Sequence, residues 1–181
     1  MKPIKKNIDN YKPKKDRSLR FLTFAVFSLF IGFGFCIGFY PYTLIDLYGF
    51  SKILAVFTVV GFLIPLKYYQ KWFHFIKYET IIFNFIGTGP LLTGLFFLLN
   101  FTFSSNPFVH QYKIEKMYFE GDESYKSFGV ILENNIFSGE RKIVELTDIS
   151  PYELMNKKYL KLTISKGLFG YDVIKERELI Q

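Results

Sequence analysis

The sequence predicts a membrane protein of three transmembrane α-helices followed by a small β-rich (α+β) soluble domain of about five antiparallel strands and one short helix. Three observations predict this class. Residues 21–103 hold three apolar blocks, of which the first and the third contain no Asp, Glu, Lys, Arg or His. The twenty residues before them are strongly basic. The segment 106–181 alternates apolar and polar residues in short runs separated by turn signals, which is typical of antiparallel strands.

Residues 1–20 form a predicted basic cytoplasmic tail with eight Lys and Arg against two Asp, whereas residues 106–181 carry eleven basic and twelve acidic residues. Because the positive charge is confined to the tail and one short loop, the composition argues against a nucleic-acid partner. The simplest role of the tail is to set membrane orientation. A sharper alternative is contact with anionic lipid headgroups. The candidate contact residues are Lys12, Lys14, Lys15, Arg17 and Arg20.

The membrane domain is predicted over residues 21–105, and its first helix over about 21–45. An apolar run of 25 residues is longer than the core of a signal peptide and shows no small-residue cleavage site, so it is interpreted as an uncleaved anchor. Pro41 is expected to end or kink this helix. Gly34 and Gly38 form a G-x-x-x-G pair, which predicts close packing against another helix of the chain or, alternatively, a homodimer contact.

A second helix is predicted over about 52–70, although only 14 residues separate Lys52 from Lys67. Such a block is about 21 Å long, shorter than the ~30 Å hydrocarbon core, and the flanking lysines must extend toward the headgroups for it to span. The positive-inside tendency favours spanning, because the basic loop 67–79 then lies on the same side as the tail. In that loop Lys67, Lys71 and Trp72 are predicted to contact lipid headgroups.

The third helix is predicted over about 80–104, with a kink at Pro90. Gly87, Gly89 and Pro90 are predicted to serve close helix packing, and the alternative is a mid-membrane helix break that forms a transport site. The absence of ionisable residues from this block favours packing. Its sparse polar residues are Asn84, Thr88, Thr93 and Asn100.

With three spans and a cytoplasmic N-terminus, the β-rich domain 106–181 lies outside the cytoplasm. A short helix is predicted from Ser150, and a bulge near Lys116. The predicted strands are His110–Phe119, Tyr125–Glu133, Arg141–Thr147, Lys158–Lys166 and Tyr171–Leu179.

The last two strands predict a hairpin with a clear alternation. Leu160, Leu162 and Ile164 are expected to face inward, and Lys161, Thr163 and Ser165 outward. Leu168 and Phe169, in the turn between two glycines, are candidate contacts for a protein partner; the alternative is that they tuck into the small core.

The sequence carries none of the common catalytic or cofactor-binding motifs. The chain has no phosphate-binding loop, no H-E-x-x-H and no G-x-S-x-G motif, and its single cysteine, Cys36, excludes an internal disulfide. The sequence therefore predicts no enzyme, no cofactor and no metal. The composition, with scarce alanine and abundant Phe, Ile and Lys, favours a bacterial inner (cytoplasmic) membrane, with the C-terminal domain in the periplasm.

These observations predict a non-enzymatic structural or interaction subunit whose partners are the lipid bilayer and either another protein or a second copy. One alternative is a small transporter or channel subunit that uses the Gly87–Pro90 break. The other is an envelope enzyme in which His110 or the outward carboxylates act as acid–base groups.

Overall fold

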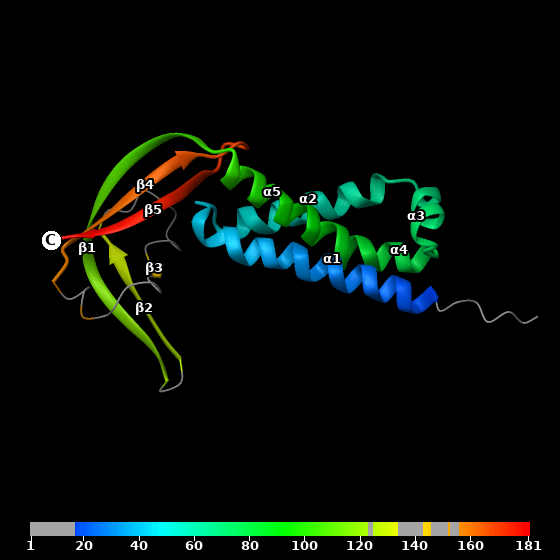
Figure 1. Ribbon diagram of the computed structural model, residues 1–181, viewed down its shortest axis with the longest axis horizontal. Coiled ribbons are helices and arrows are strands. Elements are labelled where there is room, and N and C mark those ends of the chain that lie inside the picture. The colour runs from blue at the N-terminus through cyan, green and yellow to red at the C-terminus, as the bar shows by residue number, and fades with distance from the viewer. Residues whose placement is uncertain (1–16, 123–124, 134–142, 146–151, 153–155) are drawn as a thin grey trace, which may run out of the picture.

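The computed structural model places a bundle of long helices at one end of the molecule and a curved antiparallel sheet at the other (Figure 1). It describes residues 17–122, 125–133, 143–145, 152 and 156–181. The predicted α+β layout, with apolar helices preceding an antiparallel sheet, is confirmed. Two helical segments, Phe21–Tyr42 and Lys77–Thr102, are long and apolar enough to cross a membrane. A third would qualify if the bent pair formed by α2 and α3 is one span.

The first helix, α1, spans Arg17–Phe39 and passes into a 3₁₀ turn at Tyr40–Tyr42. Pro41 lies at the start of that turn, so the prediction that it ends the helix is confirmed. The candidate membrane span Phe21–Tyr42 begins where the prediction of about 21–45 placed it and ends three residues earlier, while the helix itself extends back to Arg17. The helix begins at Arg17 because polar residues can continue a helix beyond its apolar part, and it ends before Pro41 because a proline ring cannot follow the last turn without a clash.

The predicted single helix over 52–70 is two helices, α2 (Leu47–Leu63) and α3 (Leu66–Phe73), bent by 81°. Asp46 caps α2 by accepting a 2.8 Å hydrogen bond from the Gly49 N–H. Pro65 explains the bend, because it forces the preceding Ile64 into an extended conformation with a ψ of 120°. As a result, α3 lies across the end of the bundle that is remote from the sheet (Figure 1).

The next helical segment is continuous over Lys77–Thr102 and consists of α4 (Lys77–Phe83), a π-helical segment (Asn84–Thr88) and α5 (Gly89–Thr102). No break separates α4 from α5 at Pro90, where a kink was predicted. The Gly89 N–H bonds to the Asn84 carbonyl, five residues back, in the wider π geometry. This widened turn accommodates the proline ring and its missing N–H without separating the two halves.

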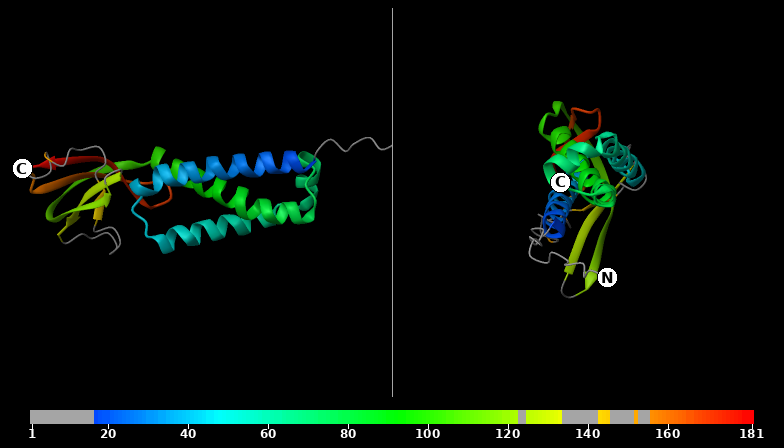
Figure 2. Two further views of the ribbon diagram at one scale, coloured as in Figure 1. Left: turned by 90° about the horizontal axis from the view of Figure 1, so that it is seen from below. Right: turned by 90° about the vertical axis from the view of Figure 1, so that its right-hand side faces the viewer.

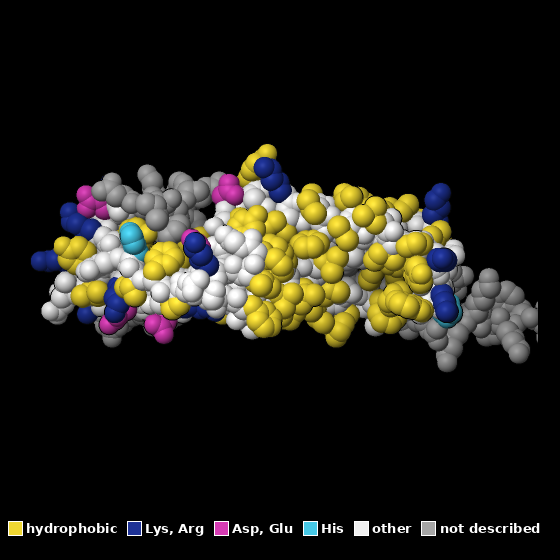
Figure 3. Space-filling model, turned by 90° about the horizontal axis from the view of Figure 1, so that it is seen from above, with side chains coloured by type: hydrophobic (Ala, Val, Ile, Leu, Met, Phe, Trp, Pro, Cys, Tyr) yellow, Lys and Arg dark blue, Asp and Glu magenta, His cyan; other side chains and the backbone are white. Residues whose placement is uncertain are grey.

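Within the bundle, α5 is the central helix and packs against both α1 and α2. The three run alternately up and down, so the start of α1 and α3 share one end, and the sheet follows α5 at the other (Figures 1 and 2). Apolar side chains cover the middle of the bundle on the face shown in Figure 3, and Lys or Arg side chains gather toward its ends. This distribution is consistent with a membrane location.

The sheet has the strand order β3-β2-β1-β4-β5, with every neighbouring pair antiparallel. Its central strand β1 is unusually long, at 18 residues. The strands are β1 (Ser105–Asp122), β2 (Tyr125–Leu132), β3 (Ile143–Glu145), β4 (Tyr159–Lys166) and β5 (Asp172–Ile180). The register shifts between Ile114 and Lys116, which confirms the predicted bulge near Lys116. The first part of β1 pairs with β4 and the second with β2, so the sheet curves around its core.

The core of the sheet is formed by residues of β1, of β2 on one side of it, and of β4 and β5 on the other. Its buried members are Tyr112, Val130, Leu132, Leu160, Leu162, Ile164 and Ile174. The predicted hairpin is confirmed as β4–β5. Ser165, predicted to face outward, is buried because it pairs with Val173, which is itself bridged by Thr43 from the helical bundle. Most of the helix predicted from Ser150 lies outside the described residues.

Candidate functional site

The most specific set of contacts in the molecule lies at the junction between the helical bundle and the sheet. Asn100, fully buried near the end of α5, donates through Nδ2 to the Tyr171 carbonyl at 3.0 Å and accepts at Oδ1 from the Phe169 N–H at 2.9 Å. Gly167 lies so close to this amide that any Cβ would overlap it. The turn between β4 and β5 is therefore clamped to α5.

Aromatic contacts reinforce this clamp. The Phe169 ring stacks on Phe96 of α5 with centroids 4.4 Å apart and planes 13° from parallel, and Tyr171 meets the same ring edge-on at 5.9 Å. Phe169 thus contacts the helical bundle rather than the core of the sheet, and it remains 44% exposed beside a 53% exposed Leu168. The alternative that these residues tuck into the core of the sheet is therefore wrong, and the predicted contact with a protein partner stays a prediction.

A second attachment joins β5 to the connection between α1 and α2. The Leu44 N–H donates to the Asp172 carbonyl at 2.7 Å, and Thr43 forms a β-bridge with Val173. The guanidinium of Arg177 lies 4.9 Å above the Tyr42 ring. Two separate chain segments therefore hold the sheet to the bundle.

Lys175 completes the junction at the C-terminal end of α5. Its Nζ donates to the Phe101 carbonyl at 2.6 Å and lies 3.8 Å above the Phe101 ring. A cation there is favoured by the negative end of the helix dipole. Burial against the helix lowers the pKa of Lys175 below its usual 10.5.

A buried polar pair lies toward the opposite end of the bundle. The Tyr69 hydroxyl of α3 is 3.0 Å from the Gly61 carbonyl of α2 and 2.8 Å from Oδ1 of Asn84 in the π-helical segment. A hydroxyl carries one proton and cannot donate to both oxygens. If the Asn84 amide is rotated by half a turn, its Nδ2, which has no other partner among the described residues, donates to the Tyr69 oxygen. The Tyr69 hydroxyl can then donate its proton to the Gly61 carbonyl. These two hydrogen bonds join α2, α3 and the π-helical segment.

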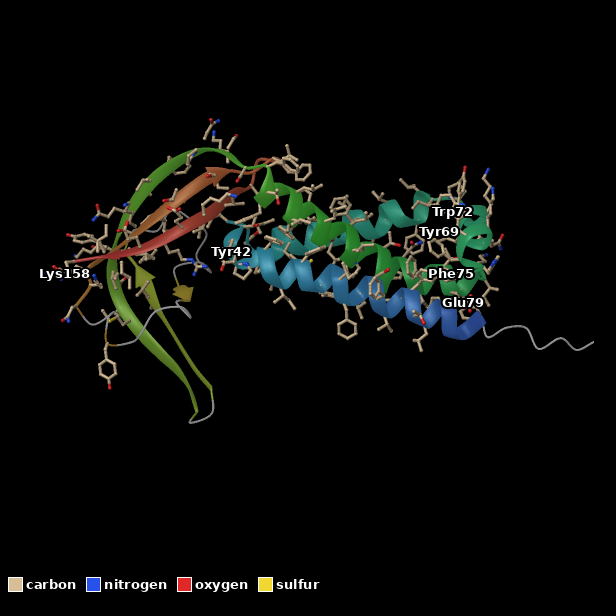
Figure 4. All side chains as sticks on the ribbon, in the orientation of Figure 1. Tyr42, Tyr69, Trp72, Phe75, Glu79 and Lys158 are labelled. Atoms are coloured by element: carbon tan, nitrogen blue, oxygen red, sulfur yellow. The ribbon has the colours of Figure 1, made fainter. Side chains whose placement is uncertain are left out.

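The predicted headgroup residues gather at this same end. Lys67, Lys71 and Trp72 are exposed on α3, while Tyr69 of that helix is buried. Figure 4 shows Trp72 and Tyr69 at the end of the bundle remote from Tyr42. Arg17 and Arg20 lie in the first turns of α1, beside this end, whereas Lys12, Lys14 and Lys15 lie outside the described residues.

For Gly34 and Gly38 the predicted packing against another helix of the chain is wrong, and the alternative of a homodimer contact stays a prediction. A Cβ built at Gly34 or Gly38 meets no atom of the described residues within 4 Å, so these glycines do not pack inside the chain. Gly32 does, because a Cβ there would overlap the backbone of Pro90, and Gly94 approaches Gly32 equally closely from α5. Residues two apart on a helix point about 200° apart, so Gly34 faces away when Gly32 faces α5.

The packing predicted around Pro90 has a mixed outcome. Pro90 is buried against Gly32, and Gly89 lies against the Thr58 hydroxyl of α2, so both serve contacts between helices. Gly87 instead faces the ring of Phe83 in its own helical segment, at 2.7 Å from a built Cβ. The close approach of α5 to both neighbours therefore depends on Gly89, Pro90 and Gly94.

Asn100 and Tyr69 were missed as site residues in the sequence. Asn100 is a polar residue in an apolar span, and such residues usually find a buried partner, which is the signal that could have identified it. Tyr69 carried no such signal, because tyrosine is common at membrane interfaces.

Comparison with known proteins adds no assignment: no family model matches the chain, and no curated protein or solved structure matches it significantly. In the part of the chain that the structure describes, no three His, Cys, Asp or Glu residues are grouped to hold a metal ion. His110, the histidine of the enzyme alternative, has its ring 4.9 Å from that of Tyr112. The molecule thus belongs, by its geometry, to the class of helical bundles apolar enough for a membrane that carry an attached antiparallel sheet.

Proposed function

We propose that this protein is a three-span membrane subunit without catalytic activity, which holds its β-rich domain in a fixed orientation outside the cytoplasm for contact with another protein or a second copy. The observation that carries this proposal is the double attachment of the sheet, through Asn100 and through Thr43 and Leu44. A domain that only needed tethering would not require a buried amide and a backbone bridge. A fixed orientation is useful when a surface must meet a partner in one geometry.

Three spans are supported by the arrangement of the basic residues. The 17 residues of α2 are about 25 Å long, and both Lys52 in its second turn and Lys67 in α3 can extend toward the headgroups. The start of α1, with Arg17 and Arg20, lies at the same end of the bundle as α3, so these arginines and the lysines of α3 share a side. By the positive-inside rule that side is the cytoplasm of a bacterial inner membrane, and the sheet is periplasmic.

Cysteine labelling in intact cells tests this topology, with the buried Cys36 replaced by alanine. An impermeant maleimide is expected to label Gln111→Cys, which is exposed on β1, at once. Lys71→Cys, exposed on α3, should react only after the membrane is opened. Labelling of both positions in intact cells would contradict three spans.

The mass of the complex in mild detergent tests the interaction role. We expect a protein mass above that of one 21.4 kDa chain, with either a second copy or a stoichiometric second polypeptide. A uniform population of single chains, extracted from native membranes under the mildest conditions, would refute this role.

A small transporter is the second candidate, and the buried pair of Asn84 and Tyr69 beside the π-helical segment favours it. π-helical turns occur often at functional sites, and a buried amide can coordinate a passing ion. Proton and potassium flux into proteoliposomes provides the test. Asn84→Ala should abolish the flux, while the exposed Asn156→Ala should not, and a wild-type flux equal to that of empty liposomes removes this candidate.

A further inference from the structure

The turn that joins β4 to β5, residues 167–170, reaches back along α5 instead of ending at the edge of the sheet. Its Phe169 stacks at 4.4 Å on Phe96, which precedes the end of α5 at Thr102 by six residues. At 1.5 Å per residue, six residues correspond to about 9 Å along the helix. The tip of the turn therefore lies beside the apolar part of α5 rather than beyond it.

The side chains at the tip are apolar and uncovered. Leu168 is 53% exposed and Phe169 44% exposed, in a stretch flanked by Lys166 on one side and Asp172 on the other. This order, with charged residues outside an apolar tip, matches the change from headgroups to acyl chains.

Three backbone N–H groups of the turn are paired within the protein. The Gly167 N–H donates to the Tyr171 carbonyl at 3.1 Å, and the Gly170 N–H to the Gly167 carbonyl at 3.0 Å. The Phe169 N–H donates to Asn100. A backbone that enters the bilayer must have its polar groups paired within the protein, and these three N–H groups meet that condition.

We infer that Leu168 and Phe169 insert into the outer leaflet of the bilayer. There they contact the acyl chains of phospholipids rather than another protein. The turn is then a third anchor that holds the sheet against the membrane surface. This inference rests on the proposed membrane placement of the bundle, and the experiment separates failure of one from failure of the other.

Quenching of tryptophan fluorescence by lipids brominated on their acyl chains tests the insertion. The natural Trp72 is first replaced by phenylalanine, and single tryptophans are then introduced at Leu168, at Phe30 and at Val109. Phe30 is 72% exposed on α1 and reports on the bundle, while Val109 is 56% exposed on β1 and reports on the sheet. The proteins are reconstituted into phosphatidylcholine vesicles with and without bromine.

We expect strong quenching for Leu168→Trp and Phe30→Trp, and little for Val109→Trp. Quenching at position 30 but not at 168 overturns the insertion and leaves the membrane bundle intact; a blue-shifted yet unquenched signal at 168 would show that protein covers the turn. Equal quenching at 168 and 109 also overturns it, because the whole sheet would then touch lipid.

No quenching at position 30 overturns the membrane placement itself. Phe169→Trp provides an independent reading of the same turn.

Discussion

The buried side chain of Asn100 and the backbone N–H of Phe169 are joined by a 2.9 Å hydrogen bond across 69 residues of sequence. This bond connects the last turns of the central helix to the turn of the final hairpin. Together with the bridge from Thr43 and Leu44 to β5, it fixes the orientation of the sheet on the helical bundle.

Replacing Asn100 with alanine should therefore release the hairpin from the bundle. The substitution removes one donor and one acceptor, and each buried partner left unpaired costs about 1–3 kcal/mol. We expect a lower thermal midpoint in detergent and faster proteolysis within residues 166–172. Asn156→Ala, at an exposed asparagine, is the control and should change neither measurement.

The glycines of α1 offer a matched pair of substitutions. Gly32→Ala places a methyl group against the backbone of Pro90, which cannot move aside, and overpacking of this kind costs about 1–3 kcal/mol. Gly34→Ala adds the same methyl group where no described atom lies within 4 Å. Unfolding in increasing fractions of denaturing detergent should show a loss of stability for Gly32→Ala alone. A loss for Gly34→Ala of the same size would instead point to a contact with a second chain.

The pairing of Tyr69 with Asn84 can be measured by a double-mutant cycle. Tyr69→Phe leaves the Gly61 carbonyl and the Asn84 amide without their partner, at a cost of about 1–3 kcal/mol for each buried group. The combined Tyr69→Phe and Asn84→Ala variant should lose less stability than the sum of the two single variants, because the second change removes a group already unpaired. Strict additivity would show that the two side chains do not interact.

The pH dependence of the sheet should contain a contribution from Glu178. The hydrogen bond and the charge of Lys161, 2.6 Å away, lower the pKa of this carboxyl below its usual 4.5. Since the folded value is depressed, the stabilisation is present above pH 4.5 and is lost as the pH falls through the folded pKa. Carboxyl-carbon NMR should show the pKa of Glu178 rising toward 4.5 in Lys161→Met. Lys157→Met should raise this pKa less, because Lys157 interacts with Glu178 only through a weaker charge–charge attraction, without a hydrogen bond.

Much of the fold could be predicted because it follows from patterns along the chain. Charge-free apolar blocks identify α1 and the segment ending in α5, and alternation identifies β4 with its inward Leu160 and Leu162. The bulge near Lys116 was visible as a change of phase in the apolar pattern. The 81° bend after α2 could not be read from the sequence, since a proline such as Pro65 signals the end of a helix but does not give the direction that the chain then takes.

The junction could not be predicted, because its partners are brought together by tertiary structure alone. Nothing near Asn100 in the sequence indicates Phe169 or Tyr171, and a polar residue in a span signals a partner without naming it. The wrong prediction that Gly34 and Gly38 pack within the chain has a similar origin. The G-x-x-x-G spacing at Gly34 marks a face of α1, but which face meets α5 depends on the rotation of the helix, which only packing determines.

The passage from α5 into β1 has a mechanical consequence. Only Phe103 and Ser104 separate the helix from a strand of 18 residues, whose contour length is about 60 Å. The clamp at Asn100 and the bridge at Thr43 tie the sheet to the bundle at two places, so α5 and the sheet are expected to turn together. In the proposed membrane placement, a change in bilayer thickness that tilts α5 by a few degrees is therefore expected to displace the far end of β1 by several ångströms, on the order of the spacing between strands.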